Sequence, residues 1–239
     1  MARNTPSILD RIYIVSVSPD TDIWKVCDSL NASGSVEYAE PIFKEKLLLT
    51  PNDPAASIGG DQYYLSKIQA YDAWDDYTGN PSIIVGIIDT GSDLNHEDLV
   101  TKYAVNSAET ENGEDTDGNG YIDDFRGYDF ANNDNDPSAD SDPHGTRVAG
   151  LVGAATNNQI GIAGVGYNTS IIPLKIFSSI NNQSAGSYES IQYAADNGYG
   201  VINLSWGSIG SYSQFNQDII NYAAIEKDVL IVAAGGNTD

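Results

Sequence analysis

The stretch IIVGIIDTG, residues 83–91, is a run of apolar residues that ends in an aspartate, a threonine and a glycine. A short apolar run bounded by turn-forming residues predicts a buried β-strand. Further apolar strands follow, separated by amphipathic helices, and this alternation predicts a parallel sheet covered on both faces, an α/β fold. The expected elements are helices at 145–155, 187–197 and 214–226 and strands at 83–88, 171–177, 201–205 and 229–234.

The composition is strongly acidic. The 239 residues include 34 Asp and Glu against 11 Lys and Arg, which gives a formal net charge of -23. Such a surface repels the phosphates of nucleic acids and of anionic lipids, so we expect no nucleic acid and no membrane as partners. Crowded carboxylates raise one another's pKa, and a bound cation such as Ca²⁺ relieves this repulsion. The single cysteine, Cys27, cannot form an internal disulfide and does not decide the compartment.

A smaller region precedes the sheet. Residues 12–17 predict a strand, a helix is expected to begin after Asp20 or Asp22, and residues 36–38 predict a second short strand. Two prolines and a Ser-Ile-Gly-Gly stretch follow, and such residues predict a linker or the start of the next domain. The expected parts are a small α+β unit, this linker and a larger α/β domain, at residues 1–50, 51–61 and 62–239.

An aspartate and a histidine stand where a parallel sheet places its functional groups. Asp89 follows the strand at 83–88, and functional residues of such sheets lie just past the carboxyl ends of strands. His144, one of only two histidines, stands at the start of a predicted helix. Alone, Asp89 could be a turn or helix cap and His144 a structural histidine. Together they suit a catalytic pair, because a carboxylate fixes the tautomer of an imidazole.

Three motifs carry a resemblance to a known family. Asp89-Thr-Gly, Asn95-His-Glu-Asp-Leu99 and His144-Gly-Thr-Arg-Val-Ala-Gly150 resemble, in order and spacing, the motifs of the subtilisin-like serine proteases, or subtilases. The resemblance implies the family's three-layer, parallel-sheet fold and hydrolysis of peptide bonds by acyl transfer. It also implies that Asp89 orients the imidazole and that His144 is the general base of an Asp-His-Ser triad, the arrangement for which subtilisin is itself a reference case.

Two later segments resemble the family's substrate cleft. Residues 201–207 resemble the strand that pairs with the substrate backbone, which implies recognition by strand addition. Residues 231–237 resemble the strand whose last asparagine donates to the oxyanion, which implies that Asn237 lies in an oxyanion hole. An ordinary buried strand and a turn asparagine are the alternatives. The resemblance implies substrate contacts from Ser205, Trp206, Gly207, Ala234 and Gly235.

The family's nucleophile is a serine in a Gly-Thr-Ser-Met-Ala-like motif, and no residue up to Asp239 matches it. Since the members of a triad act as a unit, we expect this polypeptide alone to be inactive and a longer parent protein to be the serine endopeptidase. Residues 36–41 resemble the last strand of the family's propeptide, which implies a zymogen with a partial propeptide that acts as an intramolecular inhibitor. The resemblance further implies protein or peptide substrates and an extracellular, secreted parent whose signal peptide is not present in this chain.

Residues 115–124, with the sequence DTDGNGYIDD, place oxygen-bearing side chains at alternating positions and a glycine at the sixth. This pattern is typical of a looped Ca²⁺ site. The twelfth position is Arg126 rather than Glu, so the loop is not a complete EF-hand, and a solvated acidic loop is the alternative. The expected ligands are Asp115, Asp117, Asn119, the Tyr121 carbonyl and one of Asp123 or Asp124.

A second Ca²⁺ site follows from the resemblance alone. Residues 156–162, with the sequence TNNQIGI, resemble the family's calcium loop after the histidine helix. An ordinary turn is the alternative for this loop. The resemblance implies ligands from the carbonyls of Thr156, Ile160 and Ile162 and from the side chains of Asn158, Asp98 and Asp53.

Two other functions compete with the serine protease. Residues 89–92, Asp-Thr-Gly-Ser, also fit the signature of aspartic proteases, but such an enzyme needs a second carboxylate that shares the proton, and the motif occurs once. The alternation of helices and strands also contradicts the all-β fold of that class. The other competitor is a non-catalytic calcium-binding or scaffolding module on a subtilase fold. The missing serine favours it, whereas the intact Asp89, His144 and Asn237 argue against it.

Overall fold

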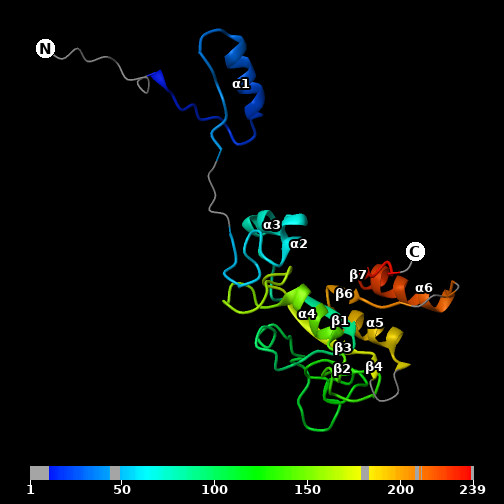
Figure 1. Cartoon of the computed structure of the whole chain (residues 1–239). Coiled ribbons are helices and arrows are strands. Elements are labelled where there is room, and N and C mark those ends of the chain that lie inside the picture. The colour runs from blue at the N-terminus through cyan, green and yellow to red at the C-terminus, as the bar shows by residue number, and fades with distance from the viewer. Residues whose placement is uncertain (1–10, 44–48, 179–182, 208–209, 211, 238–239) are drawn as a thin grey trace. The chain divides into compact units, whose positions relative to one another are not determined.

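The chain divides into two compact units, Met1–Lys46 (unit 1) and Leu47–Asp239 (unit 2) (Figure 1). The computed structural model describes residues 11–43, 49–178, 183–207, 210 and 212–237. None of the helices in these ranges is long and apolar enough to cross a lipid bilayer.

Unit 1 contains one described helix of more than a single turn, α1 (Ile23–Ala32). It begins after Asp22, whose side chain accepts a hydrogen bond from the Lys25 amide at 3.3 Å, so the predicted helix start is confirmed. The strands expected at 12–17 and 36–38 are wrong, because neither segment pairs with another described segment. A strand is completed by its partner's hydrogen bonds, which a sequence pattern cannot supply.

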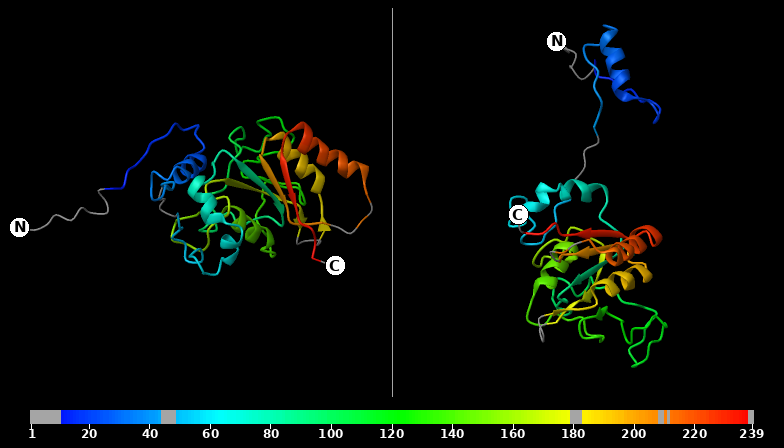
Figure 2. Two further views of the ribbon diagram at one scale, coloured as in Figure 1. Left: turned by 90° about the horizontal axis from the view of Figure 1, so that it is seen from above. Right: turned by 90° about the vertical axis from the view of Figure 1, so that its right-hand side faces the viewer.

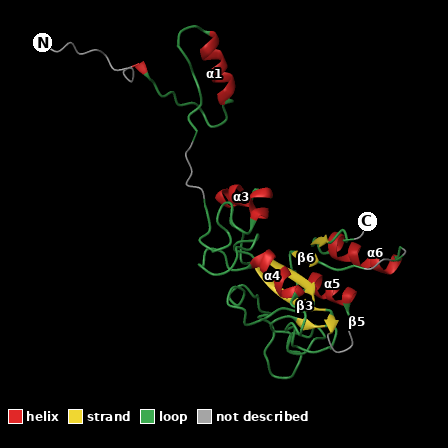
Figure 3. Cartoon of the chain, viewed as in Figure 1, coloured by secondary structure: helices red, strands yellow, loops and turns green. Residues whose placement is uncertain are grey.

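Unit 2 is built on a five-stranded sheet in the order β2-β3-β1-β6-β7. All of its strand pairings are parallel, and Val85 lies opposite both Ile171 and Val201. Figure 3 shows these strands in yellow. The predicted parallel α/β fold is confirmed. The strands are β1 (Ile84–Asp89), β2 (Tyr128–Asp129), β3 (Ser170–Lys175), β6 (Val201–Leu204) and β7 (Leu230–Ala233), and a separate antiparallel pair is β4 (Phe177–Ser178) with β5 (Gln183–Ser184).

Helices cover both faces of the sheet, as Figure 2 shows. Helix α4 (His144–Gly153) packs on one face, and α5 (Ser187–Asp196) packs on the other together with α6 (Gln214–Asn221), which continues into a π-helical turn, η2 (Tyr222–Glu226). The helices expected at 145–155, 187–197 and 214–226 are therefore confirmed. Two short helices that the sequence pattern did not predict precede the sheet, α2 (Tyr63–Lys67) and α3 (Ala70–Asp76).

Strand β1 shows why the run at 83–88 has no polar alternation. Val85 and Ile87 pack toward α4 in one core cluster, while Ile88 packs toward α5 in another. Both faces of the strand are therefore buried, and each such aliphatic side chain stabilises the fold by about 1.5–3 kcal/mol. The edge strand β7 differs, because Leu230 and Val232 are exposed.

The segment at 51–61, expected as a linker or the start of the second domain, packs within unit 2. Ala56 is fully buried in a cluster with Leu65 and Trp74. The Tyr71 hydroxyl donates to the Ala56 carbonyl at 2.6 Å. This cluster fixes the segment against α2 and α3, so Asp53 is held in a defined place.

Candidate active site

The sheet and α4 bring the predicted Asp and His together. Asp89 is the last residue of β1, and His144 is the first residue of α4. Oδ1 of Asp89 lies 2.6 Å from Nδ1 of His144, and the side chain of Asp89 is 1% exposed whereas that of His144 is 50% exposed. A buried carboxylate in this position favours the tautomer with the proton on Nδ1, which leaves Nε2 able to accept a proton.

The junction between β1 and α4 holds this pair in place. Oγ1 of Thr90 accepts from the Gly145 amide at 2.9 Å and donates to the Asp142 carbonyl at 3.1 Å. Oδ1 of Asp142 in turn accepts from the amide of His144 at 2.9 Å. A Cβ on Gly145 would lie 2.2 Å from the Gly91 carbonyl oxygen, so only glycine allows the helix to begin this close to the strand.

A buried lysine beside Asp89 anchors the loop that leads to His144. Lys175 is opposite Asp89 in the sheet, and its Nζ lies 2.9 Å from both Oδ2 of Asp129 and Oδ1 of Asp140. Burial lowers the pKa of Lys175, but the hydrogen bonds to the two carboxylates and their charges outweigh it and raise the pKa. The sequence reasoning missed this residue, although a lone lysine in the apolar strand at 171–177 was the available signal.

The candidate substrate residues follow β6 and β7. Parallel strands end at the same edge of a sheet, so the segments after these strands share an edge with Asp89. The Ala234 amide donates to the Leu204 carbonyl at 2.9 Å, which extends the pairing beyond β7. The Trp206 ring packs edge-on against Tyr188, with ring centroids 6.5 Å apart. These segments contain the predicted oxyanion donor Asn237, which is exposed, and the predicted substrate contacts Ser205, Trp206, Gly207, Ala234 and Gly235.

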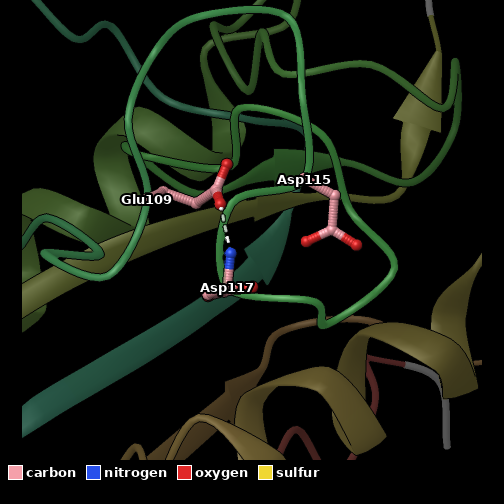
Figure 4. Close-up of side chains that lie close together, drawn as sticks. All are labelled: Glu109, Asp115 and Asp117. Atoms are coloured by element: carbon pink, nitrogen blue, oxygen red, sulfur yellow. Dashed lines mark hydrogen bonds between the residues drawn. The ribbon is translucent and has the colours of Figure 1, made fainter.

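The predicted calcium loop at 115–124 gathers only part of the expected ligand set. Asp115 and Asp117 lie together with Glu109, which the sequence reasoning missed, and one carboxylate oxygen from each falls within 4.8 Å of the others (Figure 4). Asp123 lies outside this group and accepts from the Asn112 and Gly113 amides.

Three further residues of this loop, Asn119, Tyr121 and Asp124, take part in hydrogen bonds within the loop or to neighbouring segments. Asp124 is fully buried and accepts from Asn106, Asn119 and the Tyr193 hydroxyl. Oδ1 of Asn119 accepts from the Tyr121 amide at 2.8 Å. Asp124 therefore joins the loop to α5, and the side-chain amides of Asn106 and Asn119 link it to Asp117 as well.

The loop at 156–162 meets two buried carboxylates. Asp53 accepts from the Asn157 and Asn158 amides at 2.7 and 3.0 Å. Asp98 accepts from Nδ2 of Asn158 at 2.8 Å and from the Ile162 amide at 3.0 Å. The structure thus brings Asn158 together with Asp53 and Asp98, and Ile162 together with Asp98, whereas Thr156 and Ile160 of the same loop form no hydrogen bond to either carboxylate.

This arrangement fits a hard cation. Asp53 and Asp98 are each 2% exposed, and no Lys or Arg in the described ranges forms an ion pair with them. Carboxylate oxygens are the ligands that Ca²⁺ prefers, so these two side chains suit such an ion, although their oxygens here accept from amide groups of the loop. Gly161 has φ +47° and its Cβ would lie 2.5 Å from Oδ2 of Asp98, so a side chain there would block the carboxylate.

Comparisons with known proteins agree with this geometry. The chain is 35% identical over 216 residues to the thermophilic serine proteinase of Bacillus sp. (strain AK1), covering 89% of this chain and 47% of that protein. It is 37% identical over 195 residues to thermitase of Thermoactinomyces vulgaris, covering 79% and 60%. The chain thus spans about half the length of these curated relatives.

A solved structure and a family model extend the comparison. The structure of a protease from Pseudoalteromonas arctica PAMC 21717 matches with a TM-score of 0.59 and 30% identity, covering 79% of this chain and 60% of that one. The model of the subtilase family matches residues 80–239, a range that contains both Asp89 and His144. The chain therefore belongs to the subtilase family.

Proposed function

We propose that the protein to which this chain belongs is a serine endopeptidase that hydrolyses peptide bonds through an Asp-His-Ser triad. The observation that carries the proposal is the 2.6 Å contact between Nδ1 of His144 and the buried Oδ1 of Asp89. In this proposal Asp89 holds the proton on Nδ1, and Nε2 of His144 takes the proton of a serine hydroxyl as it attacks the peptide carbonyl. In this proposal the serine belongs to the longer parent protein.

The proposed substrate is a protein or peptide that binds in extended form beside β6. Ser205, Trp206 and Gly207 would contact its backbone and side chains from one side, and Ala234 and Gly235 from the other. Asn237 would donate to the oxyanion, where one such donor changes turnover by about 10²–10³-fold, a figure taken from subtilisin itself. The common edge of β6, β7 and β1 in the sheet order supports this arrangement.

We also propose that Ca²⁺ binds to unit 2. Side chains of Asp53, Asp98 and Asn158 would hold one ion together with the carbonyls of Thr156, Ile160 and Ile162. A second would bind at the acidic loop, for which the sequence pattern proposes Asp115, Asp117, Asn119, the Tyr121 carbonyl and one of Asp123 or Asp124. When bound, the ions would compensate buried negative charge and fix the two loops.

For unit 1 we propose the role of an intramolecular propeptide inhibitor, and for the parent protein an extracellular location. The separation of residues 1–46 as a compact unit of their own supports the first proposal. The family resemblance supports the second. A direct test of inhibition is to add the separate 1–46 peptide to the active parent protein and measure the loss of peptide hydrolysis.

The peptidase proposal is tested on the parent protein extended through its predicted serine segment and freed of unit 1. We expect it to cleave a labelled protein substrate and to lose this activity with a serine-directed covalent inhibitor. His144→Ala should lower turnover by about 10³-fold or more, because the triad acts as a unit. His96→Gln, at the exposed second histidine, is the matched control and should retain activity.

A folded extended protein that cleaves nothing would contradict the peptidase proposal. That result would favour the second candidate, a non-catalytic calcium-binding or scaffolding module, for which the buried carboxylates at the 156–162 loop are the specific observation.

A further inference from the structure

We propose that the ion pair between Lys175 and Asp140 positions His144 for catalysis. The other ion pair of Lys175, with Asp129, stabilises the sheet and has no part in this positioning. Lys175 and Asp140 are thus positioning residues, which act through His144 and do not touch the substrate. Their role in catalysis rests on the proposed peptidase activity, whereas their effect on the contact between His144 and Asp89 does not.

The amine of Lys175 joins two different parts of the molecule. Its Nζ lies 2.9 Å from Oδ2 of Asp129, which belongs to β2, the strand next to β3 in the sheet. It lies at the same distance from Oδ1 of Asp140, whose side chain is 35% exposed and belongs to the loop before α4. Burial lowers the pKa of Lys175, but the two carboxylates raise it more, so the amine stays protonated. One ion pair therefore lies within the sheet, and the other joins the sheet to the loop.

Asp140 lies where a shift of the loop is passed on to His144. Just before it, the Ala139 amide donates to the Ser92 carbonyl at 3.1 Å. Two residues after it, Oδ1 of Asp142 accepts from the amide of His144 at 2.9 Å, at the first residue of α4. The Lys175 ion pair fixes the chain between these two attachments, so its loss gives the segment that leads to Asp142 more freedom.

The contact that depends on this loop is short. Nδ1 of His144 lies 2.6 Å from Oδ1 of the buried Asp89. The side chain of His144 is 50% exposed, so the position of its backbone, which the loop helps to set, has a large part in orienting the ring. A catalytic group that is misplaced by about 1 Å can lose about 10²-fold in rate. A small shift of the loop is therefore enough to lower turnover.

The first test follows the Nδ1 proton of His144 by NMR of the 239-residue chain. A proton held between an imidazole and a buried carboxylate resonates far downfield and exchanges slowly with water. The chain has two histidines, and His96→Gln assigns the resonance. Asp140→Asn keeps the size of the side chain and removes its charge. We expect its resonance to move upfield and to exchange about fivefold faster, because a neutral acceptor binds the Lys175 amine less tightly.

Two further variants serve as controls. Asp136→Asn is the matched control in the same loop, since Asp136 is exposed and its bond from the Ser138 amide can be kept by asparagine. It should leave the resonance unchanged. Asp129→Asn weakens the other ion pair of Lys175, and we expect a lower urea midpoint with the wild-type resonance in the folded protein. Lys175→Met is not decisive, because it leaves the buried Asp129 without its cation and lowers stability whatever Asp140 does.

The second test measures kinetics on the extended parent protein. Asp140→Asn should lower kcat by about tenfold and change KM by less than about twofold, because the proposed substrate contacts after β6 and β7 are untouched. Asp140→Glu keeps the charge and should recover most of kcat, which a merely steric role of the side chain would not predict.

A wild-type resonance and wild-type kcat in Asp140→Asn would overturn the inference. An equal change of the resonance in Asp140→Asn and Asp136→Asn, or in Asp140→Asn and Asp129→Asn, would overturn it as well. If the extended protein cleaves nothing, the peptidase proposal fails, and the NMR comparison still decides whether the Lys175–Asp140 ion pair holds His144 against Asp89.

Discussion

Replacing Tyr193 by phenylalanine removes one hydroxyl and tests how the acidic loop is joined to the core. Tyr193 lies on α5, is 3% exposed, and donates to Oδ2 of the fully buried Asp124 at 2.5 Å. Burial raises the pKa of Tyr193 far above its usual value, and the charges of Tyr199 and Asp124 raise it further, so the hydroxyl stays protonated as a donor. A hydrogen bond to a charged group contributes about 1.5–3 kcal/mol.

We expect Tyr193→Phe to lower the free energy of unfolding by about 2 kcal/mol, because Asp124 keeps its two asparagine donors. With a urea slope of about 3 kcal/mol per molar, the unfolding midpoint of unit 2 would fall by about 0.7 M. The matched control is Tyr188→Phe on the same helix, whose hydroxyl has no hydrogen bond to a described residue, and it should change stability by less than about 0.5 kcal/mol. Equal midpoints for the two variants would refute the reasoning.

Three further substitutions test how the residues around Asp89 and His144 and the tyrosine Tyr103 contribute to stability. Gly145→Ala should destabilise unit 2 by about 1–3 kcal/mol in urea unfolding, because its Cβ meets a backbone oxygen at 2.2 Å, whereas Gly200→Ala, with its nearest contact at 3.6 Å, should cost less than half as much. Lys175→Met removes the cation that lies against the buried Asp129 carboxylate, and we expect a loss of about 3–5 kcal/mol in the same assay, with wild-type stability as the contrary result. Burial raises the pKa of Tyr103 to about 12, so the stability that this residue contributes below pH ~10 should fall by about 2–3 kcal/mol as pH rises to ~12, and Tyr103→Phe should make the fall in stability over this range smaller by that amount.

Periodicity predicted the longer strands and helices of unit 2. The strands from 83 to 234 and the three main helices formed where the apolar pattern placed them, within a few residues. The strands at 12–17 and 36–38 failed, because alternating apolar residues show which faces a strand could have but not whether a partner pairs with it. The two-residue strand β2 and the five-residue helix α2 are too short for a periodic signal.

Some residues of the candidate site were predicted from the sequence, and others were not. Motif resemblance identified Asp89 and His144, and the register of β1 with the start of α4 then accounts for their contact. The sequence did not identify Lys175 and Glu109, because both residues are notable only for their burial, which depends on the folded chain. A lysine among apolar residues can be read as the end of a strand, and a glutamate in an acidic loop as a solvated residue.

Part of the acidic composition consists of carboxylates that the fold buries. Of those that are nearly inaccessible, Asp89 contacts a histidine and Asp129 a lysine, whereas Asp53, Asp98 and Glu109 have no described basic partner. Amide donors satisfy individual oxygens but leave the net charge in place, and a chain with 11 Lys and Arg has few cations to offer. The fold therefore places its uncompensated charge at two loops built from oxygen donors, and removal of Ca²⁺ by a chelator should lower the thermal stability of unit 2 through both.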